Sequence, residues 1–189
     1  GKGDGYYDRK TNTVVIADDL TPEQTNETAM HELVHSVTSD ALFDKNPSAS
    51  VLKAKDALKQ AYAAVMANEK SRGLMESLLS PYGELSDDAR LAEFISLALT
   101  DSGMQQILSF MRVAKEDKVL RAASWKGREL ISRLLEKVSQ FLNTIFGLTL
   151  TKLPTDTMFS ALIGLSYQLK QSGKKVDLTA EDDSIIQDH

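Results

Sequence analysis

Apolar positions recur at helical spacing along most of the chain, but the front segment follows a different pattern. Two β-prone runs there, Tyr6–Asp8 and Thr13–Ile16, flank a polar turn and predict a hairpin. A Thr-Pro-Glu-Gln sequence beginning at Thr21 then predicts a capping box with proline at the first helical position. The helix behind it should end near Ser39-Asp40, and its apolar stripe consists of Ala29, Met30, Leu33, Val34 and Val37.

The rest of the chain is patterned as further helices separated by proline, glycine and capping residues. Ser86 before two aspartates is a typical helix start. Trp125 and the apolar stripe after it are expected in the core, and an interface to missing parts of a larger protein is the alternative. We expect an α+β fold that is predominantly helical, with a small N-terminal β-hairpin and about six helices. The helices after the first should begin at Asn46-Pro47 and run past Val65, form weakly over Leu74–Leu79, and then cover Asp87–Thr100, Met104–Leu120, Trp125–Phe146 and Asp156–Gln171.

Composition limits the class of protein and of metal site. With 189 residues, 42% of them hydrophobic and 26% charged, the chain suits one compact domain, or one with an appended subdomain. The net charge of −5 argues against nucleic acid or an anionic membrane as the main partner. The absence of cysteine excludes disulfides and thiolate metal ligands. Because the chain begins with Gly1, we expect an excised domain of a larger protein.

Residues 31 to 35 read His-Glu-Leu-Val-His and use two of the three histidines in the chain. Four residues are just over one helical turn, so His31 and His35 project from the same face of the first helix. Two imidazoles arranged in this way can hold one divalent metal ion, and Glu32 can act on water beside that ion as a general base. Two other interpretations stay open: a histidine pair without metal, and a metal site without catalysis.

A catalytic zinc ion needs a third protein ligand, which we expect to be a carboxylate. Glu93 is the one charged group inside an otherwise apolar stretch, so burial would require a partner for it. A metal ion is one such partner, and an ion pair with Arg90 is the alternative. His189 is the remaining histidine and lies in a polar tail. Weaker carboxylate candidates lie near helix ends: Glu84, Asp87, Asp88 and Asp101.

These residues resemble the zincin metallopeptidases, and within them the gluzincins, in which a Glu from a later helix joins the H-E-x-x-H motif. The matching positions are His31, Glu32, His35 and Glu93. The front segment from Gly5 through the motif, and the Ala-Glu-Phe-Ile stretch around Glu93, are also similar to metallopeptidase domains of large bacteriophage virion polyproteins. The resemblance covers residues 5–110. Several gluzincins carry an acidic residue shortly after the ligand Glu, whereas Ser96 and Leu97 follow here.

The resemblance implies a zincin-like catalytic domain over residues 1–110. A helical subdomain over 111–173 should pack on it, and residues 174–189 should form a polar tail without fixed structure. Tyr82 and Tyr167 are the hydroxyls considered for stabilising an oxyanion, with a packing role as the simpler interpretation of each. The front hairpin is most simply packed on the helix, and its functional interpretation is an edge that aligns an extended peptide by backbone pairing.

Our hypothesis from the sequence is a zinc-dependent endopeptidase with one Zn²⁺ per chain. It would cleave a peptide or protein substrate through metal-activated water, with Glu32 as general base. Other parts of a parent polyprotein are possible partners, and no nucleic acid or membrane is expected. The sequence does not determine the localisation; the phage virion and the cytoplasm of the infected host are two options. The alternatives are a non-catalytic zinc-binding structural domain of a larger virion protein and a metal-free helical interaction domain.

Overall fold

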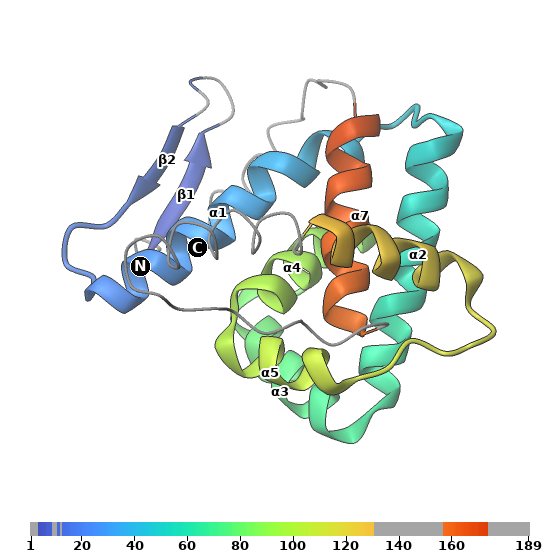
Figure 1. Ribbon diagram of the computed structural model, residues 1–189. Helices are drawn as coiled ribbons and strands as arrows, with labels where there is room; N and C mark the ends of the chain where they lie inside the picture. The colour runs from blue at the N-terminus through green and yellow to red at the C-terminus, as the bar shows by residue number, and fades with distance from the viewer. Residues whose placement is uncertain (1–3, 9–10, 12, 131–156, 174–189) are drawn as a thin grey trace, which may run out of the picture.

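The protein is predominantly helical, with a two-stranded antiparallel hairpin at its N-terminal end (Figure 1). The computed structural model describes residues 4–8, 11, 13–130 and 157–173. The predicted helical α+β class is therefore confirmed. Among the described helices, none combines the length and the apolar character that a membrane span requires.

The hairpin pairs β1 (Gly5–Asp8) with β2 (Thr13–Ile16), close to the predicted bounds. Gly5 lies opposite Ile16 in the register, and the hairpin packs on α1 (Pro22–Leu42). A Cβ atom at Gly5 would lie 2.6 Å from Cγ2 of Thr28 on α1 and 2.7 Å from the backbone oxygen of Val15. Glycine therefore allows the start of β1 to lie directly against α1.

Helix α1 begins as predicted and continues past its predicted end. The Thr21 hydroxyl accepts a hydrogen bond from the Gln24 amide at 3.3 Å, and the Gln24 side chain accepts one from the Thr21 amide at 3.0 Å. This reciprocal pair is the predicted capping box. The helix ends at Leu42 rather than near Ser39-Asp40. Ala41 and Leu42 are almost completely buried, so tertiary packing extends the helix by two to three residues.

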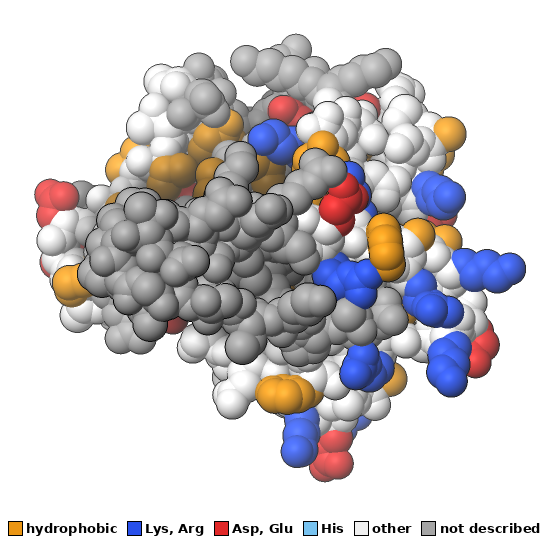
Figure 2. Space-filling model, viewed as in Figure 1, with side chains coloured by type: hydrophobic (Ala, Val, Ile, Leu, Met, Phe, Trp, Pro, Cys, Tyr) orange, Lys and Arg blue, Asp and Glu red, His pale blue; other side chains and the backbone are white. Residues whose placement is uncertain are grey.

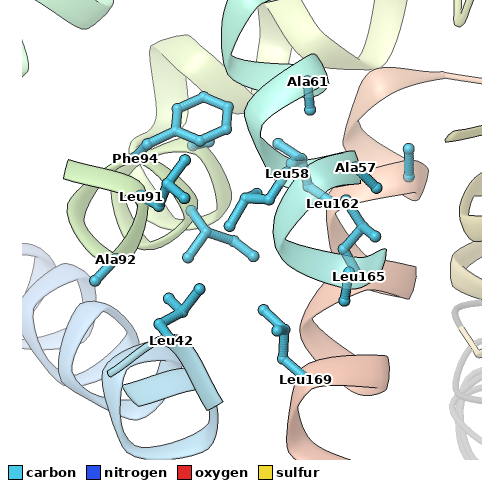
Figure 3. Close-up of a cluster of buried hydrophobic side chains, with 14 of the residues drawn as sticks. Leu42, Ala57, Leu58, Ala61, Leu91, Ala92, Phe94, Leu162, Leu165 and Leu169 are labelled. Atoms are coloured by element: carbon cyan, nitrogen blue, oxygen red, sulfur yellow. The ribbon is translucent and has the colours of Figure 1, made fainter. Parts of the chain in front are cut away.

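The other helices pack around a common core. Figure 3 shows Leu42 of α1, Leu58 of α2, Phe94 of α4 and Leu165 of α7 converging on the same interior. Helix α4 is buried on nearly all sides and begins after Ser86, as predicted. The bounds are α2 (Ala49–Ala67), α3 (Glu69–Leu79), the short 3₁₀ helix η1 (Ser80–Tyr82), α4 (Asp87–Thr100), α5 (Ser102–Phe110) and α7 (Met158–Ser172).

The prediction of a single helix over Met104–Leu120 is wrong. Helix α5 ends at Phe110, and the amide of Met158 then donates to the backbone oxygen of Met111 at 2.7 Å. After Phe110 the backbone therefore pairs with a segment distant in sequence, and this pairing takes the place of the hydrogen bonds that would continue the helix. A new helical stretch over 118–130 follows, started by the Asp117 carboxylate, which accepts from the Leu120 amide at 2.9 Å.

Trp125 is 62% exposed and does not join the core, contrary to expectation. Helix α7 lies close to the predicted 156–171 and packs against α1, α2, α4 and α5. The division between residues 1–110 and 111–173 stays a prediction. The second half of the helix predicted over Trp125–Phe146 and the predicted tail 174–189 lie outside the described residues.

Candidate metal centre

Helix α1 presents two imidazoles one turn apart, as its residue spacing requires. His31 is 9% exposed and His35 is fully buried. Their Nε2 atoms are 3.0 Å apart, and their rings meet edge to face with an interplanar angle of 79°. The two nitrogens therefore point toward a common region beside the helix.

Helix α4 brings the Glu93 carboxylate to the same place. Its Oε2 lies 3.2 Å from Nε2 of His31, and its Oε1 lies 3.2 Å from Nε2 of His35. Glu93 is fully buried, as the apolar surroundings in the sequence predict. The three residues form a buried group that could hold a metal ion. Within the described residues it is the only such group of three or more His, Asp or Glu side chains.

The distances between these donor atoms can be compared with those between the ligand atoms of a bound metal ion. Ligand atoms at 2.0–2.1 Å from a tetrahedral zinc ion are about 3.3–3.4 Å apart. The three observed separations of 3.0, 3.2 and 3.2 Å differ from this by a few tenths of an ångström. The nitrogen and oxygen donors are also the types that zinc accepts in the absence of cysteine. The residues therefore fit a metal ion.

Ser96 fixes the two ligand-bearing helices against each other. Its hydroxyl is buried and donates to the backbone oxygen of His31 at 2.8 Å, across 65 positions of sequence. On α1 itself, the Ser39 hydroxyl donates to the backbone oxygen of His35 at 2.6 Å. From the sequence, Ser96 stands out only as a departure from the gluzincin pattern. The signal that could have identified its role is a small polar residue one turn after Glu93 on an apolar helix.

The electrostatics of His31 favour the form that binds metals. Burial lowers the pKa of His31 below its ordinary value of 6.5, and the neighbouring His35 lowers it further. The hydrogen bond to Glu93 and the charges of Glu93 and Glu32 oppose this effect, but burial is the largest cause. The lowered pKa favours the neutral imidazole, which is the form that binds a metal ion.

Glu32 lies beside the group, almost completely buried, on a cleft of about 450 Å³. His31 and Tyr82 line the same cleft. Burial raises the pKa of Tyr82 above its ordinary value, and the charges of Glu93 and Glu32 and hydrogen bonding to Glu93 raise it further. Tyr82 thus remains protonated and offers a hydroxyl donor next to the predicted general base.

The other residues considered from the sequence lie elsewhere. Arg90 donates to the backbone oxygen of Leu85 at 3.2 Å, while Glu93 faces the histidines. Tyr167 lies on α7 with the Lys126 ammonium 5.4 Å from its ring centre, and it borders a separate cavity. His189 lies outside the described residues.

The weaker carboxylate candidates are not part of the metal group. Asp88 pairs with Lys55 at 2.6 Å, and Asp101 caps α5 by accepting from the Met104 amide at 2.8 Å. Glu84 and Asp87 are exposed. Each therefore has a local role, or a solvated position, that needs no metal.

No protein-family model matches the chain, and no curated protein or solved structure is significantly similar to it. The resemblance to gluzincins and to phage metallopeptidase domains thus stays a prediction. Any assignment of function has to be argued from the arrangement of His31, His35, Glu93 and Glu32.

Proposed function

We propose that the protein is a zinc-dependent endopeptidase of gluzincin type with a zincin-like fold. His31, His35 and Glu93 would hold one zinc ion per chain. The observation that carries this proposal is the buried triangle of donor atoms, 3.0 to 3.2 Å on each side, one of whose members, His31, lines a cleft together with Glu32. A purely structural histidine pair needs neither the buried carboxylate nor the cleft.

Zinc held there supplies Lewis-acid chemistry, acidifying water and polarising a peptide carbonyl. Glu32 takes the proton from the attacking water as general base and then passes it to the leaving amine. Its position on the cleft next to His31 supports this role. Tyr82 donates its hydroxyl proton as a hydrogen bond to the oxygen on which negative charge develops.

The hairpin supports a peptide substrate. Asp4 and Gly5, at the start of β1, line the same cleft as His31 and Glu32. A strand beside a cleft can align an extended peptide through its backbone, and β1 begins at this cleft. The cleft would thus receive a polypeptide in extended form.

The test combines metal analysis with a variant that removes only the general base. Purified protein should contain about one zinc ion per chain and cleave members of a fluorogenic peptide library. Glu32→Gln should keep the zinc and the fold while kcat falls by about 10²–10⁴-fold, the usual contribution of a general base. Elemental analysis, circular dichroism and peptide turnover measure the three properties.

A matched variant, His35→Ala, should lose both the zinc and the turnover. Normal cleavage by Glu32→Gln would contradict the mechanism, and protein purified without chelators but free of zinc would contradict the metal site.

The second candidate function is a structural zinc site without catalysis. It is favoured by the burial of His35 and Glu93 between α1 and α4, where an ion would join two helices. In that case the protein would bind zinc and gain stability from it, yet cleave no member of the library. The two functions therefore differ in turnover and agree in metal content.

A further inference from the structure

The cleft beside the metal centre has apolar walls and several carboxylates. Leu78, Pro81 and Leu97 provide the apolar surface. Apart from Glu32, the acidic side chains on the cleft come from three different elements: Asp4 before β1, Glu27 on α1 and Asp101 between α4 and α5. No lysine or arginine is present among the described residues that line it.

The arrangement of α1 and α4 indicates where these carboxylates lie along the cleft. Glu93 contacts both histidines, while Ser96, one turn later on α4, bonds to His31, the earlier of the two on α1. The helices are therefore antiparallel. Following α4 toward its C-terminus therefore means following α1 toward its N-terminus. Asp101, at the end of α4, lies alongside Glu27, which is one turn before His31 on α1. The acidic groups thus gather at the end of the cleft away from His35.

Among the described residues, no cationic side chain neutralises these carboxylates. In the part of the chain that the structure describes, no cation pairs with Asp4, Glu27 or Asp101. One oxygen of Asp101 accepts from the Met104 amide, which leaves its negative charge in place. The three do not form a second cage for a metal ion, since the one group found among the described residues is that of His31, His35 and Glu93.

Many of the described basic side chains lie away from the cleft. On the face drawn in Figure 2, most lysine and arginine side chains lie toward the right, the side of α2 in Figure 1, whereas the hairpin lies at the left. Lys53, Lys118 and Arg121 line cavities on that other side. Among the Asp, Glu, Lys and Arg side chains described at the cleft, all are therefore acidic.

We infer that this cleft selects peptides with a lysine or arginine side chain close to the cleaved bond; the inference rests on the proposed peptidase function. Such a side chain has an apolar stem and a cationic end. The stem would contact Leu78, Pro81 and Leu97, and the end would lie among the carboxylates of Asp4, Glu27 and Asp101. An acidic peptide would be repelled by the same groups.

The experiment compares peptides that differ at one position only. Arginine is replaced by citrulline, which has nearly the same shape without the charge, or by glutamate. At low salt we expect kcat/KM for the arginine peptide to exceed that for the citrulline peptide about tenfold, since each solvent-accessible carboxylate contributes roughly two- to threefold. The ratio should fall as salt is added.

Variants that remove one carboxylate charge each test whether these residues cause the preference for arginine. Glu27→Gln and Asp101→Asn should each lower the preference for arginine about two- to threefold. Asn caps a helix about as well as Asp, so Asp101→Asn leaves α5 intact. Glu76→Gln, an exposed carboxylate of α3 that does not line the cleft, serves as the control and should change nothing.

A binding measurement separates this inference from the proposed activity. Fluorescence anisotropy with the zinc-loaded protein reports the affinity for labelled arginine and citrulline peptides whether or not they are cleaved. Tighter binding of the arginine peptide without any cleavage would support the cleft preference and count against the peptidase. Cleavage or binding with equal preference for the two peptides would overturn the inference.

Discussion

The imidazole of His31 illustrates how one residue links metal binding to folding. The side chain of His31 belongs to the candidate metal group. The backbone oxygen of the same residue accepts a hydrogen bond from the Ser96 hydroxyl of α4. Burial keeps the ring neutral, which suits a ligand but disfavours protonation in the folded state. The His31 position was predictable from local spacing, whereas the Ser96 hydrogen bond depends on how two distant helices pack.

Lowering the pH should destabilise the metal-free protein partly through His31. Its pKa in the folded protein lies below the ordinary value of 6.5, so the unfolded state binds more protons as the pH falls through that value. The free energy of unfolding should therefore fall from about pH 7 downward and level off below the folded-state pKa. Urea unfolding at pH 7.5 and 5.5, with chelator, measures the loss.

His31→Gln is the control, because it removes the titrating group. Its loss of stability between the two pH values should be smaller than that of the wild type. An equal loss in both proteins would show that burial of His31 is not a source of the pH dependence.

At the scale of elements, helix starts were predictable because capping is local. Thr21 with Gln24, and Ser86 before α4, act through hydrogen bonds within four residues of sequence. The break between α5 and the helical stretch 118–130 was not predictable, since the bond from Met158 to Met111 joins distant parts of the chain. Close packing of that stretch on α7 likewise depends on glycines whose role appears only in three dimensions.

Two Gly→Ala substitutions should have opposite effects on stability. A Cβ at Gly164 of α7 would lie 1.9 Å from the backbone oxygen of Ala123, so Gly164→Ala should force the helices apart and cost about 1–3 kcal/mol or more. Gly73 of α3 has no atom within 4 Å of such a Cβ, so Gly73→Ala should stabilise the protein by about 0.5–1 kcal/mol. Thermal unfolding of both variants measures the difference; a stabilised Gly164→Ala would contradict the packing.

At the scale of the whole molecule, the candidate metal centre lies where α1 meets α4, and α7 packs on both. The ligands come from two helices, and Glu93 follows His35 by 58 positions in the sequence, so they meet only in the folded protein. An ion bound there would therefore stabilise the packing of α1 on α4. The hairpin adds the start of β1 to the same cleft. Function and stability are therefore expected to be coupled at this interface.

Zinc should raise the stability of the folded protein. At a buffered free zinc concentration 100-fold above Kd, the free energy of unfolding should increase by about 2.7 kcal/mol, and chelator should remove the gain. The Glu93→Gln variant loses the ligand from α4, so zinc should raise its free energy of unfolding far less. Urea unfolding with and without zinc measures both. Identical midpoints for the wild type under the two conditions would argue that no zinc is bound at this site.

The sequence by itself determined what depends on neighbours along the chain: the hairpin, the helix caps, the common face of His31 and His35, and the burial of Glu93 in an apolar helix. Tertiary structure alone decided that Glu93 meets both imidazoles at 3.2 Å, that Ser96 joins α4 to α1, and that three carboxylates share a cleft. The physical reason is range. Helical spacing and capping act over about four residues, whereas the position of one helix on another is set by the packing of side chains that are distant in sequence.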